Sequence, residues 1–291
     1  MTPHALSHLE PIPHPNPSKP RWPRRSMWLG LSLVGALVLL YVLALAWIYF
    51  QQEKILFYPK PLSADFHFNL PGVEEVTIPV PGAQLSALHF KQPNAKGVIF
   101  FLHGNGGNLQ DWLLSTDFYR RVGYDLFMLD YRGYGKSTGH IQSEVQLHAD
   151  VRAAWDVIAP QYAHKKRVIY GRSLGTGLAT QLATQVPADL LILVSPYRSV
   201  AALAERYYAW APRTILRYPL PTEQWLGQVT APVVLVHGRQ DQLIPYSHTT
   251  ALHAIKPASV VIELPDADHG DVHEFAAYHD GLAQQLARLD R

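Results

Sequence analysis

The sequence predicts an α/β fold with a mostly parallel sheet, helices on both faces of that sheet, and one transmembrane helix before it. Two observations carry this prediction. From residue 74 onward, short β-rich runs alternate with amphipathic helical stretches, a pattern typical of parallel sheets that are covered on both faces. Residues 27–50 contain no charged side chain, and this length is enough to cross the roughly 30 Å hydrocarbon core of a bilayer.

The N-terminal tail, residues 1–25, is rich in proline and poor in apolar residues, so we expect it to be disordered. Basic residues of the tail precede the apolar run, whereas Glu53 and Lys54 nearly cancel each other after it. The positive-inside rule then predicts a cytoplasmic N-terminus and a folded domain on the opposite side, which is periplasmic in a bacterium. A signal peptide cleaved at Ala44-Leu45-Ala46 is the alternative, but the apolar run continues through Phe50, which favours an uncleaved span.

After a linker at residues 51–73, a single domain is expected to occupy residues 74–291. Its first two β-rich runs are expected to form an antiparallel hairpin at the edge of the sheet. The β-rich runs are residues 74–80, 85–90, 98–102, 126–129, 168–170, 190–194, 233–236 and 260–264, and the helical stretches are residues 143–162, 178–185, 247–254 and 274–289.

Residues 196–226 interrupt this alternation with several prolines, tyrosines and tryptophans. We interpret them as a cap-like insert over the carboxyl edge of the sheet, where open α/β sheets build their binding sites.

Composition narrows the chemistry that a site in this domain can use. The chain has no cysteine, so disulfides, thiol nucleophiles and thiolate metal sites are excluded. A net charge of +2 gives no field that would favour a nucleic-acid partner. Any nucleophile is therefore an oxygen or an amine.

The motif Gly171-Arg172-Ser173-Leu174-Gly175 lies between a β-rich run and a helical stretch. In this context the two glycines allow a tight turn that lifts the Ser173 hydroxyl clear of the sheet as a nucleophile. The alternative is a serine that merely caps the following helix.

A serine hydroxyl needs a base to take its proton and a carboxylate to orient that base. Asp241 and His269 each follow a β-rich run, in the chain order Ser, Asp, His that this kind of fold uses. We therefore expect Ser173 as nucleophile, His269 as base and Asp241 as the orienting acid. His269 and His273 stand four residues apart and are also candidates for a metal pair, although no HExxH pattern accompanies them.

An acyl-transfer site also needs donors for the oxyanion that forms on attack. The glycine-rich segment HGNGGN follows the run 98–102 and lets backbone N–H groups turn toward Ser173. The expected donors are the backbone amides of Asn105 and Leu174, with Gly106 left open in place of Asn105.

Taken together, HGNGGN, DYRGYGKS, GRSLG, HGRQDQLIP and DADH resemble the α/β-hydrolase superfamily. More narrowly, they are similar to single-span serine hydrolases that include bud-emergence-type hydrolases, serine-aminopeptidase-like proteins and animal palmitoyl-protein depalmitoylases. The resemblance covers residues 74–291 and implies an α/β-hydrolase fold, the triad Ser173, Asp241 and His269, and no cofactor.

The leading functional hypothesis is a membrane-anchored serine hydrolase of esters or thioesters that works through an acyl-enzyme. Esters or thioesters of small to medium acyl chains are expected to be preferred to amides, and a lipid-like substrate fits a membrane-tethered enzyme. One alternative is an aminopeptidase, for which Glu205 or Glu223 in the insert is the candidate to hold a peptide amine. Another is a non-catalytic binding protein on the same scaffold.

Overall fold

The computed structural model describes residues 24–290. The tail expected to be disordered, residues 1–25, lies outside the described residues except for Arg24 and Arg25, which begin a helix. The chain divides into two compact units, Met1–Ala46 and Trp47–Arg291. The second unit contains the sheet, the covering helices and the last turns of the N-terminal helix, and the first contains the remainder of that helix.

The N-terminal helix, α1 (Arg24–Leu56), is apolar and exposed along most of its length. It is long and apolar enough to cross a membrane, with a mean hydropathy of 2.5 in its most apolar window. It extends six residues beyond residue 50, so residues 51–56, expected as linker, are its last turns instead. These residues, QQEKIL, are mostly good helix formers, and the helix ends where Tyr58 adopts a positive φ of 47° before Pro59.

Eight strands form one sheet in the order β1-β2-β4-β3-β5-β6-β7-β8. As predicted, β1 and β2 form an antiparallel edge hairpin, and β2 also pairs antiparallel with β4, while all other neighbours are parallel. The strands are β1 (Val73–Val80), β2 (Ala83–Phe90), β3 (Gly97–Leu102), β4 (Tyr124–Asp130), β5 (Lys166–Arg172), β6 (Leu190–Val194), β7 (Val233–Gly238) and β8 (Val260–Leu264). Every predicted β-rich run overlaps one of them, so the predicted fold class is confirmed.

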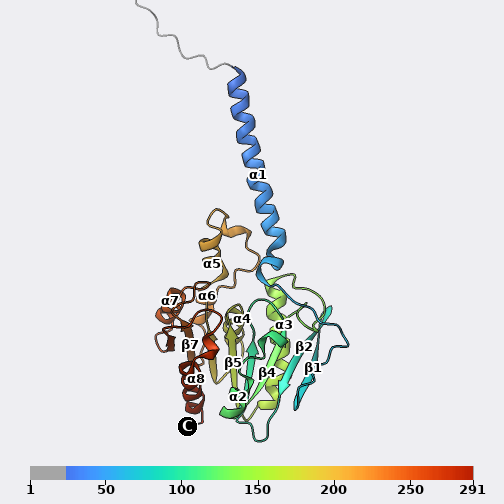
Figure 1. Ribbon diagram of the computed structural model, residues 1–291, viewed down its shortest axis with the longest axis vertical. Coiled ribbons are helices and arrows are strands. Elements are labelled where there is room, and N and C mark those ends of the chain that lie inside the picture. Colours follow the sequence, from blue (N-terminus) through green and yellow to red (C-terminus); the bar gives the residue numbers. More distant parts are fainter. Residues whose placement is uncertain (1–23, 291) are drawn as a thin grey trace, which may run out of the picture. The chain divides into compact units, whose positions relative to one another are not determined.

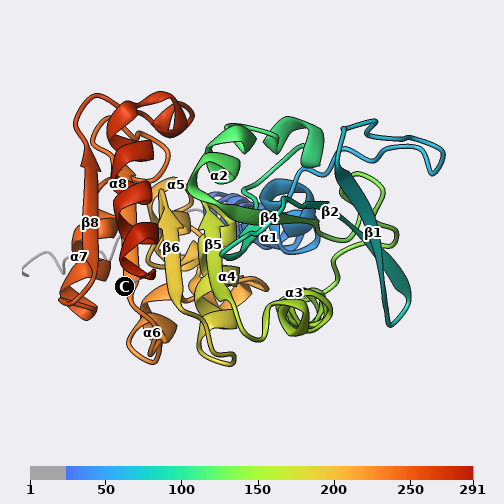
Figure 2. The ribbon, with the colours of Figure 1, turned by 90° about the horizontal axis from the view of Figure 1, so that it is seen from below.

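Helices cover both faces of the sheet, as Figure 2 shows: α2 and α8 lie on one face, and α3, α4, α6 and α7 lie on the other. The sequence did not predict α2, α5 or α6, because helices of five to eight residues are too short to give a clear helical period. The helices are α2 (Thr116–Val122), α3 (Glu144–Ile158), α4 (Gly175–Ala183), α5 (Val200–Tyr207), α6 (Thr222–Leu226), α7 (Ser247–Ile255) and α8 (Ala276–Arg288), with short 3-10 turns at Leu109–Trp112, Ala159–Tyr162, Arg213–Ile215 and Val272–Glu274.

The core consists of two apolar layers, one on each side of the sheet. Successive residues of a strand point to opposite faces, so Phe100 of β3 contacts Trp155 at a ring distance of 5.5 Å, whereas Phe101 stacks on Tyr170 at 4.7 Å. Because both layers are apolar, β3 is buried at every position. Two-sided burial explains why the central strands are continuous apolar runs in the sequence.

The insert between β6 and β7 has two parts. Helix α5 and the turn Arg213–Ile215 lie beyond the carboxyl ends of the strands, whereas α6 contacts α4 and α7 in the helical layer (Figure 1). Only the first part of residues 196–226 is therefore placed as a cap would be.

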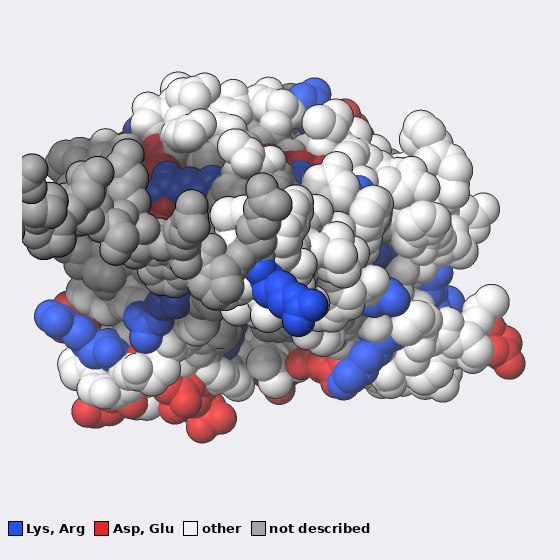
Figure 3. All heavy atoms as spheres, turned by 90° about the horizontal axis from the view of Figure 1, so that it is seen from above, with Lys and Arg blue, Asp and Glu red and all other residues white. Residues whose placement is uncertain are grey.

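Charged side chains of both signs are spread over the face of the molecule shown in Figure 3. On the face shown in Figure 3, Lys and Arg of the described residues lie among uncharged side chains. Several exposed lysines and arginines form ion pairs, such as Lys96 with Asp290 at 2.7 Å and Arg239 with Glu263 at 2.7 Å. Exposed pairs of this kind contribute little to stability, about 0–1 kcal/mol each.

Candidate active site

Ser173 stands on a sharp turn between β5 and α4. Its φ is 49°, a left-handed conformation that is uncommon for any residue but glycine. The flanking glycines are required by close approach: a Cβ on Gly175 would lie 2.1 Å from the carbonyl oxygen of Leu102, and one on Gly171 would lie 2.4 Å from that of Gly175. The turn therefore holds the serine above a tightly packed strand–helix crossing.

The Ser173 hydroxyl does not cap the helix. The N-cap of α4 is Leu174, without a side-chain capping bond. Instead, the Ser173 hydroxyl donates to Nε2 of His269, with Oγ and Nε2 3.0 Å apart. His269 Nδ1–H in turn donates to Oδ2 of Asp241, at 2.7 Å. The structure thus brings together the three side chains that the sequence placed after β5, β7 and β8.

Asp241 is buried and accepts three hydrogen bonds. Besides His269, the backbone N–H of Ile244 donates to Oδ1 at 2.7 Å, and Nε2 of His237 lies 3.1 Å from Oδ2. Burial by itself raises the pKa of this carboxyl, but the hydrogen bonds from His237 and His269, and then the bond from Ile244, outweigh it and hold the pKa of Asp241 well below its usual value. The carboxylate therefore stays ionised and keeps the proton of His269 on Nδ1, which leaves Nε2 free to accept a proton from Ser173.

His237 is a member of this network that the sequence analysis missed. It is fully buried at the end of β7. Its Nδ1 lies 2.6 Å from the hydroxyl of Thr249, while its Nε2 faces two acceptors, Asp241 and the carbonyl of Ile244. These partners assign the proton to Nε2 and make Thr249 the donor to Nδ1. In the sequence, the only sign of this role was that His237 lies four residues before Asp241, at the end of a buried strand. That pattern by itself is equally typical of an ordinary core histidine.

The glycine-rich loop after β3 distinguishes between the two oxyanion candidates that the sequence left open. The amide of Gly106 donates to the carbonyl of Phe57 at 2.9 Å, and that of Gly107 donates to Tyr58 at 3.2 Å. Within residues 24–290, the amides of Asn105 and Leu174 donate to no other group. Both residues line the same pocket as Ser173, so these two amides are available to a ligand and that of Gly106 is not.

Two further residues hold the loops of the site in place. His103, fully buried after β3, contacts the carbonyl of Gly104 through Nδ1 at 2.7 Å, and the hydroxyl of Tyr131 donates to the His103 carbonyl at 2.8 Å. Arg172, next to the serine, donates through Nη2 to the carbonyls of His269 and Gly270 at 3.0 and 3.2 Å. Arg172 therefore ties the loop that carries the histidine to the turn that carries the serine.

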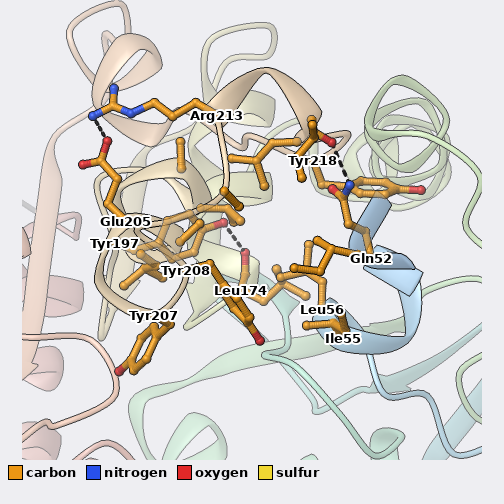
Figure 4. A pocket seen from close by; sticks show the side chains of 18 of the residues that line it. Gln52, Ile55, Leu56, Leu174, Tyr197, Glu205, Tyr207, Tyr208, Arg213 and Tyr218 are labelled. Atoms are coloured by element: carbon orange, nitrogen blue, oxygen red, sulfur yellow. Dashed lines mark hydrogen bonds and ion pairs between the residues drawn. The ribbon is translucent and has the colours of Figure 1, made fainter. Parts of the chain in front are cut away.

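Ser173 opens into a pocket of about 540 Å³. Figure 4 shows side chains from the end of α1 and from the insert around it, together with Leu174 and Tyr197. Most of its lining is aliphatic or aromatic. Glu205 forms an ion pair with Arg213 at this pocket, and Glu223 pairs with Arg198 at 2.8 Å.

The metal alternative lacks the geometry that it requires. His269 lies in a turn and His273 in the short 3-10 turn Val272–Glu274, so the two do not share one face of an α-helix. The described part of the chain contains no cluster of three or more His, Asp or Glu side chains suited to a metal ion.

Comparison with known proteins places this chain in a family. Residues 93–222 match the family model described as "Serine aminopeptidase, S33". Alpha/beta hydrolase domain-containing protein 17B of Xenopus tropicalis is 32% identical over 203 residues, a match that covers 66% of this chain and 67% of that protein. The human protein of the same name is 32% identical over 207 residues, covering 67% of this chain and 68% of that protein. The chain belongs to the α/β-hydrolase family.

The fold of this α/β-hydrolase is shared with solved structures. The Pyrococcus furiosus esterase PF2001 superposes with a TM-score of 0.65 at 17% identity, over 81% of this chain and 98% of that chain. At this identity the likeness concerns the fold. Asp241 and His269 lie outside the matched residues 93–222, so their place in the site comes from the hydrogen bonds of the structure.

Proposed function

We propose that this hydrolase is a membrane-anchored serine enzyme that cleaves ester or thioester bonds through an acyl-enzyme. The supporting observation is the unbroken chain of hydrogen bonds from Ser173 to His269 to Asp241, with distances of 3.0 and 2.7 Å, beginning at a serine that lines an apolar pocket. A non-catalytic binding protein would have no need of this arrangement.

In the proposed reaction, Oγ of Ser173 attacks the acyl carbonyl carbon while Nε2 of His269 takes the hydroxyl proton. Asp241 stabilises the imidazolium that forms. The amides of Asn105 and Leu174 donate to the oxyanion of the tetrahedral intermediate. The intermediate then breaks the bond to the leaving alcohol or thiol, which receives the proton from His269, and the acyl group remains on Ser173.

The second half of the reaction repeats these roles with water. His269 takes a proton from a water molecule, whose oxygen attacks the acyl carbonyl of the ester on Ser173. Collapse of this second intermediate releases the carboxylic acid and returns the proton to Oγ of Ser173. The enzyme is thereby restored without any further reactant.

The pocket supports an acyl substrate in preference to a peptide. Its volume of about 540 Å³ is within the range of small-molecule sites, ~300–1,000 Å³, and leaves room for the small to medium acyl chains expected from sequence. The aminopeptidase alternative is favoured by the name of the matched family model. Against it, Glu205 and Glu223 are both engaged by arginines, so neither offers an unpaired carboxylate to a peptide amine.

Two measurements on the full-length protein test this proposal. A fluorophosphonate probe should label the wild type and should not label Ser173→Ala. The ratio of kcat/KM for a p-nitrophenyl ester to that for the matched amino-acid anilide should be well above one. Equal or greater activity on the anilide would support the peptidase, and a folded wild type that neither reacts with the probe nor hydrolyses esters would support a binding protein.

We also propose that α1 anchors the enzyme with its N-terminus in the cytoplasm and the catalytic domain on the other side. The apolar helix Arg25–Leu56 supports the anchor, and the basic residues before residue 27 support the orientation. A reporter that is active only in the cytoplasm, fused after Arg291, should be silent. A bright signal would reverse the orientation.

A further inference from the structure

We infer that the C-terminal end of α1 is a wall of the acyl site and selects for longer acyl chains, so that the anchor helix is also a specificity element. This inference rests on the proposed function and adds which part of the chain selects the substrate by the length of its acyl chain. It concerns residues 47–56, which belong to the same compact unit as the sheet.

One face of the helix end lines the pocket. Ile48, Gln52 and Ile55 are spaced by four and three residues, which places them on the same side of an α-helix, and Leu56 adjoins them. All four line the pocket that contains Ser173. Figure 4 shows Gln52, Ile55 and Leu56 on one side of the pocket and the insert residues Glu205, Tyr207 and Arg213 on another.

The helix end is fixed to the insert by specific hydrogen bonds. Gln52 is 6% exposed. Its Nε2 donates to the carbonyl of Ile215 at 2.8 Å, and its Oε1 accepts from the amide of Arg217 at 2.8 Å. The hydroxyl of Tyr218 donates to Oε1 of Glu53 at 2.8 Å, and Arg217 forms an ion pair with the same carboxylate. Both polar atoms of the buried Gln52 amide are hydrogen-bonded to one backbone segment of the insert, and this fixes the position of that segment. The helix end and the insert, which form two walls of the pocket, are thereby held in a defined relation.

The space between these walls suits an acyl chain that starts at Ser173. A pocket of about 540 Å³ is many times the ~30 Å³ that one water-sized group occupies, so a chain of several methylene groups has room in it. The insert side contributes apolar residues such as Val200, Leu203 and Leu216. Ile48 also belongs to the uncharged run of residues 27–50, so the pocket wall and the apolar segment are parts of one helix.

A short acyl group bonded to Ser173 needs little of this wall, whereas a long chain must lie along it. A larger side chain in this wall should therefore lower kcat/KM for long-chain esters without changing the chemistry at Ser173. Ile55→Trp adds bulk to the wall, and Leu43→Trp is the matched control because Leu43 is an exposed residue of the same helix outside the pocket.

The experiment measures kcat/KM of the full-length enzyme in detergent micelles on p-nitrophenyl acetate, butyrate, octanoate, dodecanoate and palmitate. Ile55→Trp should lower kcat/KM for the long esters at least about tenfold relative to acetate, because a single methylene in an apolar pocket already contributes about tenfold or more. Gln52→Ala should reduce the preference for long chains by releasing the wall. Leu43→Trp should keep the wild-type chain-length profile.

A second measurement on the wild type does not depend on the folding of any variant. A long-chain alkyl fluorophosphonate with a terminal diazirine should label Ser173 and, after illumination, cross-link to peptides from residues 48–56 or from the facing insert. If Ile55→Trp reacted with the probe and hydrolysed esters with an unchanged chain-length profile, this inference alone would be overturned. Cross-links confined to the two loops that contain Trp112 and Gly270 would have the same consequence. A wild type that fails to react at Ser173 would overturn the proposed function and this inference with it.

Discussion

Replacement of Asp241 by Asn tests the hydrogen-bond network at its centre. Three N–H donors converge on the carboxylate, from Ile244, His269 and His237, at 2.7, 2.7 and 3.1 Å. An amide of the same shape offers one acceptor oxygen and one NH₂ group in place of two acceptor oxygens. At least one of the three donors must therefore lose its acceptor.

The structure indicates which donor gives way. If the Asn oxygen keeps the buried amide of Ile244, its NH₂ group faces the two histidines. His237 retains the carbonyl of Ile244 as an acceptor at 2.8 Å, whereas His269 has no second acceptor for Nδ1 among the described residues. His269 is then expected to move its proton to Nε2, where it can no longer accept the proton of Ser173.

The expected cost of Asp241→Asn is about 10⁴-fold in kcat, the size of effect seen when a triad histidine takes the wrong tautomer, with KM nearly unchanged. Initial rates on a p-nitrophenyl ester measure this, and circular dichroism confirms folding. Asp266→Asn, at an exposed position near His269, is the control and should stay within about twofold of the wild type, since surface changes away from a site have small effects. If folded Asp241→Asn kept more than a tenth of the wild-type kcat, the orienting role of Asp241 would be refuted.

Three other predictions follow from the same geometry. Ser173→Ala and His269→Ala should each abolish most of the hydrolysis, and the double variant should be barely worse than either, because groups that act in one step are strongly non-additive; additive losses in ln kcat would contradict a shared step. The pKa of Asp241 is lowered in the folded protein. Its contribution to the free energy of unfolding is therefore present above about pH 3.9, the ordinary pKa, and is lost as the pH falls from there toward the folded value. In urea titrations at decreasing pH, the free energy of unfolding of Asp241→Asn should fall less steeply than that of the wild type, and equal slopes would count against this linkage. Gly175→Ala should lower the free energy of unfolding by about 3 kcal/mol, because its Cβ would lie 2.1 Å from the Leu102 carbonyl oxygen, whereas Gly35→Ala, which meets no atom within 4 Å, should not; similar melting temperatures for the two would refute the close-packing argument.

The order of the strands and of the longer helices, and the meeting of Ser173, Asp241 and His269, could be read from the sequence. Strand and helix patterns depend on the spacing of neighbouring residues, and each parallel strand covered on both faces leaves a continuous apolar run. The positions of Ser173, Asp241 and His269 after such runs placed them at one edge of the sheet, because carboxyl ends of parallel strands meet there. The uncharged run of residues 27–50 similarly identified the apolar helix.

The tertiary structure alone decided which groups those side chains meet. The amide of Gly106 donates to the carbonyl of Phe57, so that the amide of Asn105 is the one available to a ligand. Asp241 receives a second imidazole from His237, and Gln52 joins the helix end to a segment 163 residues away. Such contacts depend on how the loops and the insert cross the carboxyl edge of the sheet. No local period or turn motif specifies that arrangement, because the contacting residues are distant in the chain and are brought together only by the packing of the whole domain.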